Sequence, residues 1–160
     1  MHASYDKSYV RAILPHELKR ALNLVWTVFQ EYEAPDYSPQ GIQTFKEFIH
    51  YPSFQERLTS ENLTVYGYFD HTELIGVLAL RNRSHISLLF VHRAFHHRGV
   101  ARSLVQYWFN HCRAFFPTVR EITVNSSPYA VGFYHKLGFA DTSAEQTVNG
   151  IRFTPMKYKF

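Results

Sequence analysis

One stretch of the chain, residues 86–103, constrains the fold more than any other. It reads ISLLFVHRAFHHRGVARS: an apolar run predicts a buried strand, a basic and histidine-rich turn follows, and an amphipathic segment begins at Gly99. The order is therefore strand, loop and helix start. A helix start presents unpaired backbone N–H groups and the positive end of the helix dipole, and this loop carries arginines but no carboxylate. The stretch therefore predicts an anion-binding site. Because Gly99 has no side chain, an anion can approach the backbone closely there.

The composition fits one folded domain over residues 1–160. Of these 160 residues 46% are hydrophobic and 17% aromatic, enough for a full core. The formal net charge of +4 suits an anionic cofactor as well as a nucleic acid. A single cysteine excludes an intrachain disulfide and favours a reducing compartment. Because no apolar run reaches the roughly 20 residues of a membrane span and no signal-peptide core is present, we expect a soluble, cytoplasmic protein without a membrane partner.

The N-terminal part of the chain is predicted to be mostly helical. A short strand over 9–14 leads into an amphipathic helix over 16–31. The segment EYEAPDYSPQG follows and forms an acidic, aromatic loop that contains Glu33. Ser38 is expected to cap a second helix, and Ser53 with Glu56 fits a capping box for a further short turn.

The middle of the chain is predicted to form three consecutive strands and a long helix. Two runs, 64–69 and 74–81, indicate an antiparallel hairpin, and a strand over 85–91 follows. From Val100 the apolar positions recur at three- and four-residue steps, which predicts a helix of about 16 residues. Its inner stripe is expected to include Trp108, Cys112 and Phe115.

The C-terminal part is predicted to add a strand, a helix and a hairpin. Residues 121–124 read as a strand, 125–128 as the cap of a helix that Gly138 ends, and 149–150 as a hairpin turn. A crossover through a helix normally places two strands parallel, so 86–91 and 121–124 are expected to be parallel neighbours. The fold class expected is therefore α/β with a mixed sheet.

Two motifs in the second half of the chain carry a family resemblance. The first is HHRGVA at 96–101, before a helix, and the second is VNSSPYAVGFYHKLGF at 124–139. They resemble the Gln/Arg-x-x-Gly-x-Gly/Ala loop and the FYxKLGF signature of the GNAT superfamily of acyl-CoA-dependent N-acyltransferases. His96 departs from the pattern, because the family has Gln or Arg there. The resemblance covers residues 10–160 and implies a GNAT-like fold: a central, mostly antiparallel sheet with a parallel, splayed pair of strands, flanked by helices.

The resemblance implies that acetyl-CoA is a co-substrate. No metal is expected, because no carboxylate or cysteine lies near His92, His96 and His97 in the sequence. Backbone amides of the loop at 97–102 would hold the pyrophosphate, main-chain groups at 89–91 would bind the pantetheine arm, and Lys136 would meet an outlying phosphate. The cofactor-binding residues expected in this way are Leu89, Phe90, Val91, His96, His97, Arg98, Gly99, Val100, Ala101, Arg102, Asn125, Tyr134 and Lys136.

Acyl transfer to an amine needs a neutral amine, a polarised thioester carbonyl and a proton for the leaving thiolate. The pKa of a tyrosine phenol, about 10, is similar to that of an alkyl thiol, so a tyrosine can protonate the leaving thiolate. The family resemblance implies that the equivalent tyrosine has this role, and Tyr134 is therefore the expected general acid. A backbone N–H near Val91 would polarise the carbonyl. Glu33 and His85 are the candidate general bases, with ordered water as an alternative. We expect direct attack in a ternary complex by a primary amine of a small molecule or protein, and the acidic loop favours a cationic acceptor.

Other readings of the same residues stay open at this point. A non-catalytic acyl-CoA-binding module would keep the loop and lose the chemistry. A nucleic-acid binder needs a basic face with stacking aromatics, which the short loop does not supply, so no nucleic-acid partner is expected. Cys112 lies on the apolar stripe and reads as core rather than as a nucleophile. The hairpin edges near 140–159 would allow a homodimer.

Overall fold

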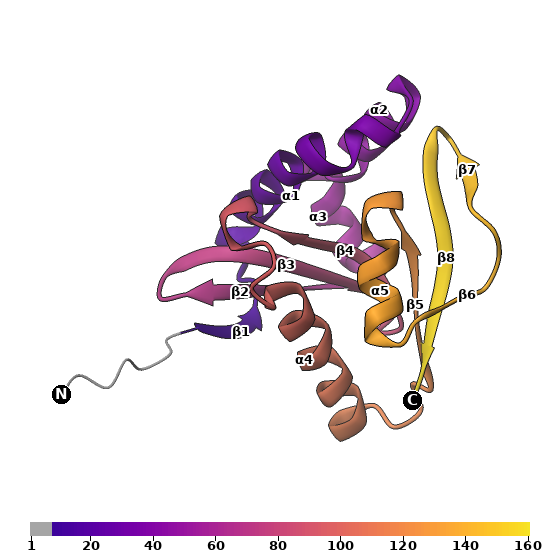
Figure 1. The fold of residues 1–160 in the computed structure, drawn as a ribbon. Coiled ribbons are helices and arrows are strands. Elements are labelled where there is room, and N and C mark those ends of the chain that lie inside the picture. The colour runs from indigo at the N-terminus through magenta and orange to yellow at the C-terminus, as the bar shows by residue number, and fades with distance from the viewer. Residues whose placement is uncertain (1–7) are drawn as a thin grey trace.

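The computed structural model describes residues 8–160, which form an eight-stranded mixed sheet with helices on both faces (Figure 1). The strand order is β1-β2-β3-β4-β5-β8-β6, with β7 paired to β8, and among these described strands β4 and β5 are the one parallel pair. The strands are β1 Ser8–Ala12, β2 Leu63–Asp70, β3 Glu73–Arg81, β4 His85–Val91, β5 Glu121–Ser126, β6 Ala140–Asp141, β7 Gln146–Val148 and β8 Ile151–Lys159. The α/β class and the mixed sheet predicted from the sequence are confirmed.

The helices connect these strands in the expected order. The α-helices are α1 Leu18–Tyr32, α2 Pro39–Phe48, α3 Tyr51–Ser60, α4 Val100–Phe115 and α5 Val131–Leu137. Four single 3-10 turns adjoin them: η1 Pro15–Glu17, η2 Ala34–Asp36, η3 Arg93–Phe95 and η4 Pro128–Ala130. Within residues 8–160, no helix combines the length and the apolar character that crossing a membrane requires.

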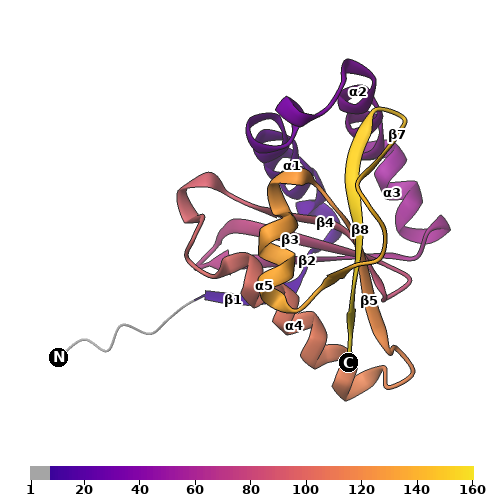
Figure 2. The same ribbon diagram turned by 45° about the vertical axis from the view of Figure 1, so that its right-hand side comes forward.

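Both faces of the sheet are buried, each under its own hydrophobic cluster. Strand β3 shows this alternation: Val77 and Ala79 belong to the cluster under α1 to α3, and Leu78 and Leu80 to the cluster under α4 and α5. The two groups of helices lie on opposite sides of the sheet in both views (Figures 1 and 2). A buried Trp108 anchors α4, and its Nε1 donates a hydrogen bond of 2.9 Å to the Arg83 carbonyl.

The parallel pair separates soon after it forms. Strands β4 and β5 are in register only at His85 with Thr123 and at Ile86 with Val124. The next residue, Ser87, lies at a register shift between β3 and β4, which is the signature of a β-bulge. Beyond it, residues 87–91 of β4 have no partner on β5 among the described residues. The sheet is therefore open between the two strands, as the family resemblance implied.

Several predicted helix and turn signals hold. The Ser38 hydroxyl accepts a hydrogen bond of 3.2 Å from the Gly41 N–H at the start of α2. Gly138 ends α5 with a φ of 101°. Asn149 and Gly150, with φ values of 51° and 80°, form the two-residue turn between β7 and β8.

Other local predictions are wrong. Helix α3 begins at Tyr51, so Ser53 lies inside it instead of capping it. Phe115 occupies the last turn of α4 and is 67% exposed, whereas the next residue, Phe116, packs against Trp108 and the core in its place. Asn125 extends β5 instead of capping a helix, since pairing with β8 continues through Ser126.

The tip of the β7–β8 hairpin packs tightly on the start of α2. A Cβ on Gly41 would overlap the Gly150 carbonyl, so only glycine fits. The Thr44 hydroxyl is 3.1 Å from the Asn149 carbonyl, and Arg152 bonds the Asp36 carbonyl at 3.4 Å. These contacts fix the connection between α1 and α2, which begins at the end of α1 beside Glu33.

Candidate active site

A cavity of about 660 Å³ opens beside the free edge of β4. Its walls come from the end of α1, the end of β4, the loop that leads into α4, and the η4–α5 segment. It brings together twelve of the residues singled out in the sequence, which are Glu33, Leu89, Phe90, Val91, His96, His97, Gly99, Val100, Ala101, Arg102, Tyr134 and Lys136.

The end of β4 turns main-chain groups toward the opening between the strands. The N–H of His92 donates to the Ile75 carbonyl, on the side of β3. In a trans peptide the C=O points the opposite way, so the Val91 carbonyl faces away from β3. Within an antiparallel ladder the N–H of a residue lies on the same side as its own C=O, so the Val91 N–H faces the opening as well.

The loop into α4 presents its amides to the same cavity. Gly99 has a φ of 78°, and a Cβ there would meet no atom within 4 Å, so the space in front of the backbone is open. Within residues 8–160, no acceptor is found for the N–H groups from Gly99 to Arg102. Unpaired N–H groups at the positive end of a helix of 16 residues suit an anion such as a pyrophosphate.

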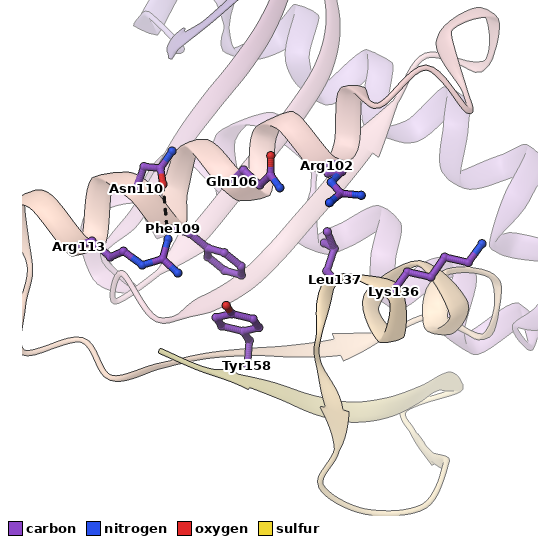
Figure 3. Close-up of a pocket in the computed structure, with 8 residues that line it drawn as sticks. All are labelled: Arg102, Gln106, Phe109, Asn110, Arg113, Lys136, Leu137 and Tyr158. Atoms are coloured by element: carbon purple, nitrogen blue, oxygen red, sulfur yellow. Dashed lines mark hydrogen bonds between the residues drawn. The ribbon is translucent and has the colours of Figure 1, made fainter.

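A second hollow of about 330 Å³ continues from the cavity between α4 on one side and α5 and β8 on the other. Arg102, Lys136 and Leu137 line both. Figure 3 shows Arg102 and Lys136 at one end of the hollow and Arg113 at the other, with two aromatic rings between them. Of the described residues that line it, none is acidic, so the hollow extends the anion-binding character of the cavity.

Glu33 follows the last residue of α1 and reaches the cavity half-buried. Burial of its carboxyl, together with the charge of Asp36, raises its pKa to about 7. The Ser127 hydroxyl lowers this pKa, although its buried oxygen has no hydrogen-bond partner of standard geometry within the described residues. A carboxyl with a pKa near neutrality can accept a proton at physiological pH.

Tyrosine side chains surround this carboxyl. Burial and then the charge of Glu33 raise the pKa of Tyr134, and the same charge contributes to the raised pKa of Tyr37 and of Tyr129. Tyr134 is 4% exposed and packs against Phe133 and Phe139, each ring centroid 5.2 Å away. It lines the cavity from α5, and its phenol stays protonated at neutral pH.

Three of the predicted residues do not reach the cavity. His85 has its Nδ1 2.8 Å from the Thr123 hydroxyl, and burial, helped by Arg81, lowers its pKa to about 4. Arg98 is exposed, with its guanidinium 5.6 Å from the Phe95 ring. Asn125 is exposed on β5, opposite Pro155. Of the two candidate bases, only Glu33 therefore shares a cavity with Tyr134.

Sequence reasoning missed several lining residues, among them Tyr32 and Tyr129 in the cavity and Arg113 in the second hollow. The spacing of Arg102, Gln106 and Arg113 along α4 places them on one helix face, which is the signal for the second hollow. Within residues 8–160, no three side chains of His, Cys, Asp and Glu gather closely enough to hold a metal ion.

The fold is that of the N-acetyltransferases. Over its whole length the chain is similar to all of a GCN5-related N-acetyltransferase from Rhodopseudomonas palustris, with a TM-score of 0.82 and 20% identity. It is similar to the PaiA N-acetyltransferase of Thermoplasma acidophilum in complex with coenzyme A, with a TM-score of 0.76, 19% identity, and 96% of this chain and 99% of that one covered. The spermidine N-acetyltransferase of Vibrio cholerae, in complex with CoA and spermine, gives a TM-score of 0.65 and 18% identity, with 96% and 95% covered.

The family follows from the sequence itself. The model of the acetyltransferase (GNAT) domain matches residues 33–160, which include both motifs and the whole cavity except Val28 and Tyr32. The chain therefore belongs to the GNAT family and is an acyl-CoA-dependent acetyltransferase. A comparison with curated proteins gives no match.

Proposed function

We propose that this enzyme transfers an acetyl group from acetyl-CoA to a primary amine by direct attack within a ternary complex. The observation that carries the proposal is the shared cavity, which holds the Glu33 carboxyl, the Tyr134 phenol and the free amides of the α4 loop. Similar folds are known in complex with coenzyme A, which supports the choice of donor.

The donor would lie along the opening between β4 and β5. In the proposed complex the amides from His97 to Arg102 bind the pyrophosphate, and the main-chain groups of Leu89, which face the same opening, bind the pantetheine arm. The phosphate on the ribose would lie toward the second hollow, where Lys136, Arg102 and Arg113 supply positive charge. The reactive thioester then reaches the part of the cavity between Glu33 and Tyr134.

The reaction would proceed in balanced steps. Glu33 takes a proton from the acceptor ammonium, and the free amine attacks the thioester carbonyl. The carbonyl oxygen accepts a hydrogen bond from the Val91 N–H as negative charge develops on it. The C–N bond forms, the C–S bond breaks, and Tyr134 protonates the leaving thiolate. The nitrogen then loses its second proton, which returns the Tyr134 phenolate to the phenol, so that one proton, held by Glu33, is released for each acetyl group transferred. Burial and, to a smaller extent, the charge of Glu33 raise the pKa of Tyr134, so protonation of Glu33 removes the smaller of the two effects and makes the phenol a stronger acid than before the amine was deprotonated.

The acceptor that fits best is a cationic amine of a small molecule or of a protein. Glu33 lines this end of the cavity and Asp36 is near enough to act on its charge, whereas Glu31 pairs with Arg93 at 3.4 Å. The exposed Tyr129 ring lies 5.1 Å from Tyr32 at the same end of the cavity. Carboxylates and aromatic faces both attract ammonium groups. The similarity in fold to a spermidine N-acetyltransferase agrees with such an acceptor.

The test is thiol release from acetyl-CoA with a panel of cationic, neutral and acidic amines. We expect release with primary amines and the fastest release with cationic ones. Activity confined to neutral or acidic amines would refute the cationic acceptor. Tight acetyl-CoA binding by calorimetry without release for any amine would refute catalysis and support an acyl-CoA-binding module instead.

A further inference from the structure

His96 stands where the family has Gln or Arg, and its side chain turns into the cavity wall. Its Nε2 lies 2.6 Å from the Val91 carbonyl oxygen, and its ring centroid lies 4.7 Å from that of Tyr32 on α1. The imidazole is half-buried and lines the cavity. One side chain thus joins the α4 loop, the end of β4 and the end of α1.

The Val91 carbonyl faces the opening between β4 and β5 and not a neighbouring strand. The peptide that contains it donates its N–H to Ile75 on β3, so the oxygen points into the opening between β4 and β5. Strand β5 has already diverged there and offers no partner. A carbonyl only accepts hydrogen bonds, so Nε2 of His96 must carry the hydrogen.

We propose that His96 is a positioning residue for acyl transfer, which occupies the Val91 carbonyl and leaves the Val91 N–H to face the acyl oxygen. This inference rests on the proposed function, because it requires an acyl oxygen at that place. An unpaired carbonyl oxygen in the opening would repel the thioester oxygen as negative charge develops on it. His96 removes that repulsion and also holds the strand end in place. Gln and Arg, which the family has at this position, also carry a side-chain N–H donor. His96 therefore departs from the family pattern in residue type but still offers an N–H to the Val91 carbonyl.

A different role is compatible with the same contacts, namely packing of α1 through the ring contact with Tyr32. Two variants separate the roles. H96F keeps an aromatic ring beside Tyr32 and loses the donor. H96Q loses the ring and keeps an N–H donor of similar reach. The matched control is H92N in the same loop, because His92 is exposed, is absent from the cavity wall, and accepts through Nδ1 from the Ala94 N–H, as an asparagine oxygen can.

The measurements are kcat, the KM values for acetyl-CoA and amine, the acetyl-CoA affinity by calorimetry, and the melting temperature. For H96F we expect kcat to fall about tenfold while the acetyl-CoA affinity changes by about twofold or less, since the lost interaction acts on the transition state. For H96Q we expect kcat within about twofold of the unmodified enzyme, as for H92N. Nitrogen-15 NMR of the imidazole should show hydrogen on Nε2.

The results separate this inference from the proposed function. If the unmodified enzyme is active and H96F keeps its kcat, or H96Q loses as much as H96F, the inference is overturned and the proposed function stands. A neutral His96 with hydrogen on Nδ1 alone also overturns the inference. If the unmodified enzyme transfers no acetyl group to any amine, the proposed function fails and the inference fails with it.

Discussion

Glu33 and Tyr134 face one cavity from opposite sides of the sheet, and the charge of the carboxylate adds to the effect of burial in raising the pKa of the phenol. Glu33 follows α1, on one face, and Tyr134 lies on α5, on the other. They meet because β4 and β5 diverge between them. A proton acceptor and a proton donor are thereby coupled across the place proposed for the thioester.

The first prediction concerns pH. A general base must be deprotonated, so kcat/KM should rise with pH through the Glu33 pKa of about 7 and then level off. E33Q should lower kcat/KM by about 10²-fold or more and abolish this acidic limb. The control is H85Q, which alters the other base predicted from the sequence and should keep the rise of kcat/KM with pH. If this rise persists in E33Q and disappears in H85Q, the general base is His85.

The second prediction concerns the general acid. Y134F removes the phenol hydroxyl and keeps the ring contacts with Phe133 and Phe139, so the fold and the acetyl-CoA affinity should be retained. We expect kcat to fall by about 10²-fold. The control is Y107F, which should be fully active, because Tyr107 lies on α4 beside Tyr66 and outside both the cavity and the second hollow. Turnover of Y134F within a few-fold of the unmodified enzyme, with donor binding intact, would contradict the role of Tyr134.

The third prediction concerns the hollow in Figure 3. If it receives the ribose phosphate of the donor, replacing Lys136 and Arg113 by methionine should weaken acetyl-CoA binding by about tenfold at low salt. Binding of the donor that lacks the 3′-phosphate should change little. The control is R120M, which removes an exposed arginine that lies outside the hollow. Equal losses for both donors would place the phosphate elsewhere.

The fourth prediction concerns the packing of the hairpin on α2. G41A introduces a Cβ that overlaps the Gly150 carbonyl, so we expect a loss of about 1–3 kcal/mol in the free energy of unfolding. G132A, at a helical position with no atom within 4 Å of the new Cβ, should instead stabilise the protein by about 0.5–1 kcal/mol. Denaturant unfolding of both variants checks the pair. An unchanged stability of G41A would show that hairpin and helix separate easily.

Much of the fold is predictable because its signals are local. The apolar repeat from Val100 gives α4 its length, and Asn149–Gly150 fixes a hairpin turn. The predictions fail where neighbours in space decide. Ser53 has the residue type of a cap, yet the helix starts earlier. Phe115 follows the apolar repeat but is exposed, because Phe116 takes the place against the core.

The candidate site divides in the same way. Gly99, Tyr134 and the loop amides were identified from motifs, because loop and helix start are continuous in the chain. The motifs did not decide between Glu33 and His85 as the general base, since both are plausible bases by residue type. Burial decides their pKa values in opposite directions, raising that of Glu33 and lowering that of His85. Burial is a property of the packed chain and leaves no pattern along the sequence.

By itself, the sequence determined the order of strands and helices, the anion-binding helix start and the family, because periodicity, turn residues and motifs act over a few neighbouring positions. Only the tertiary structure decided which groups share the cavity: Glu33 with Tyr134, and His96 with the Val91 carbonyl. Those pairings depend on a β-bulge and on the divergence of two strands, and the separation of strands is set by packing across the whole sheet.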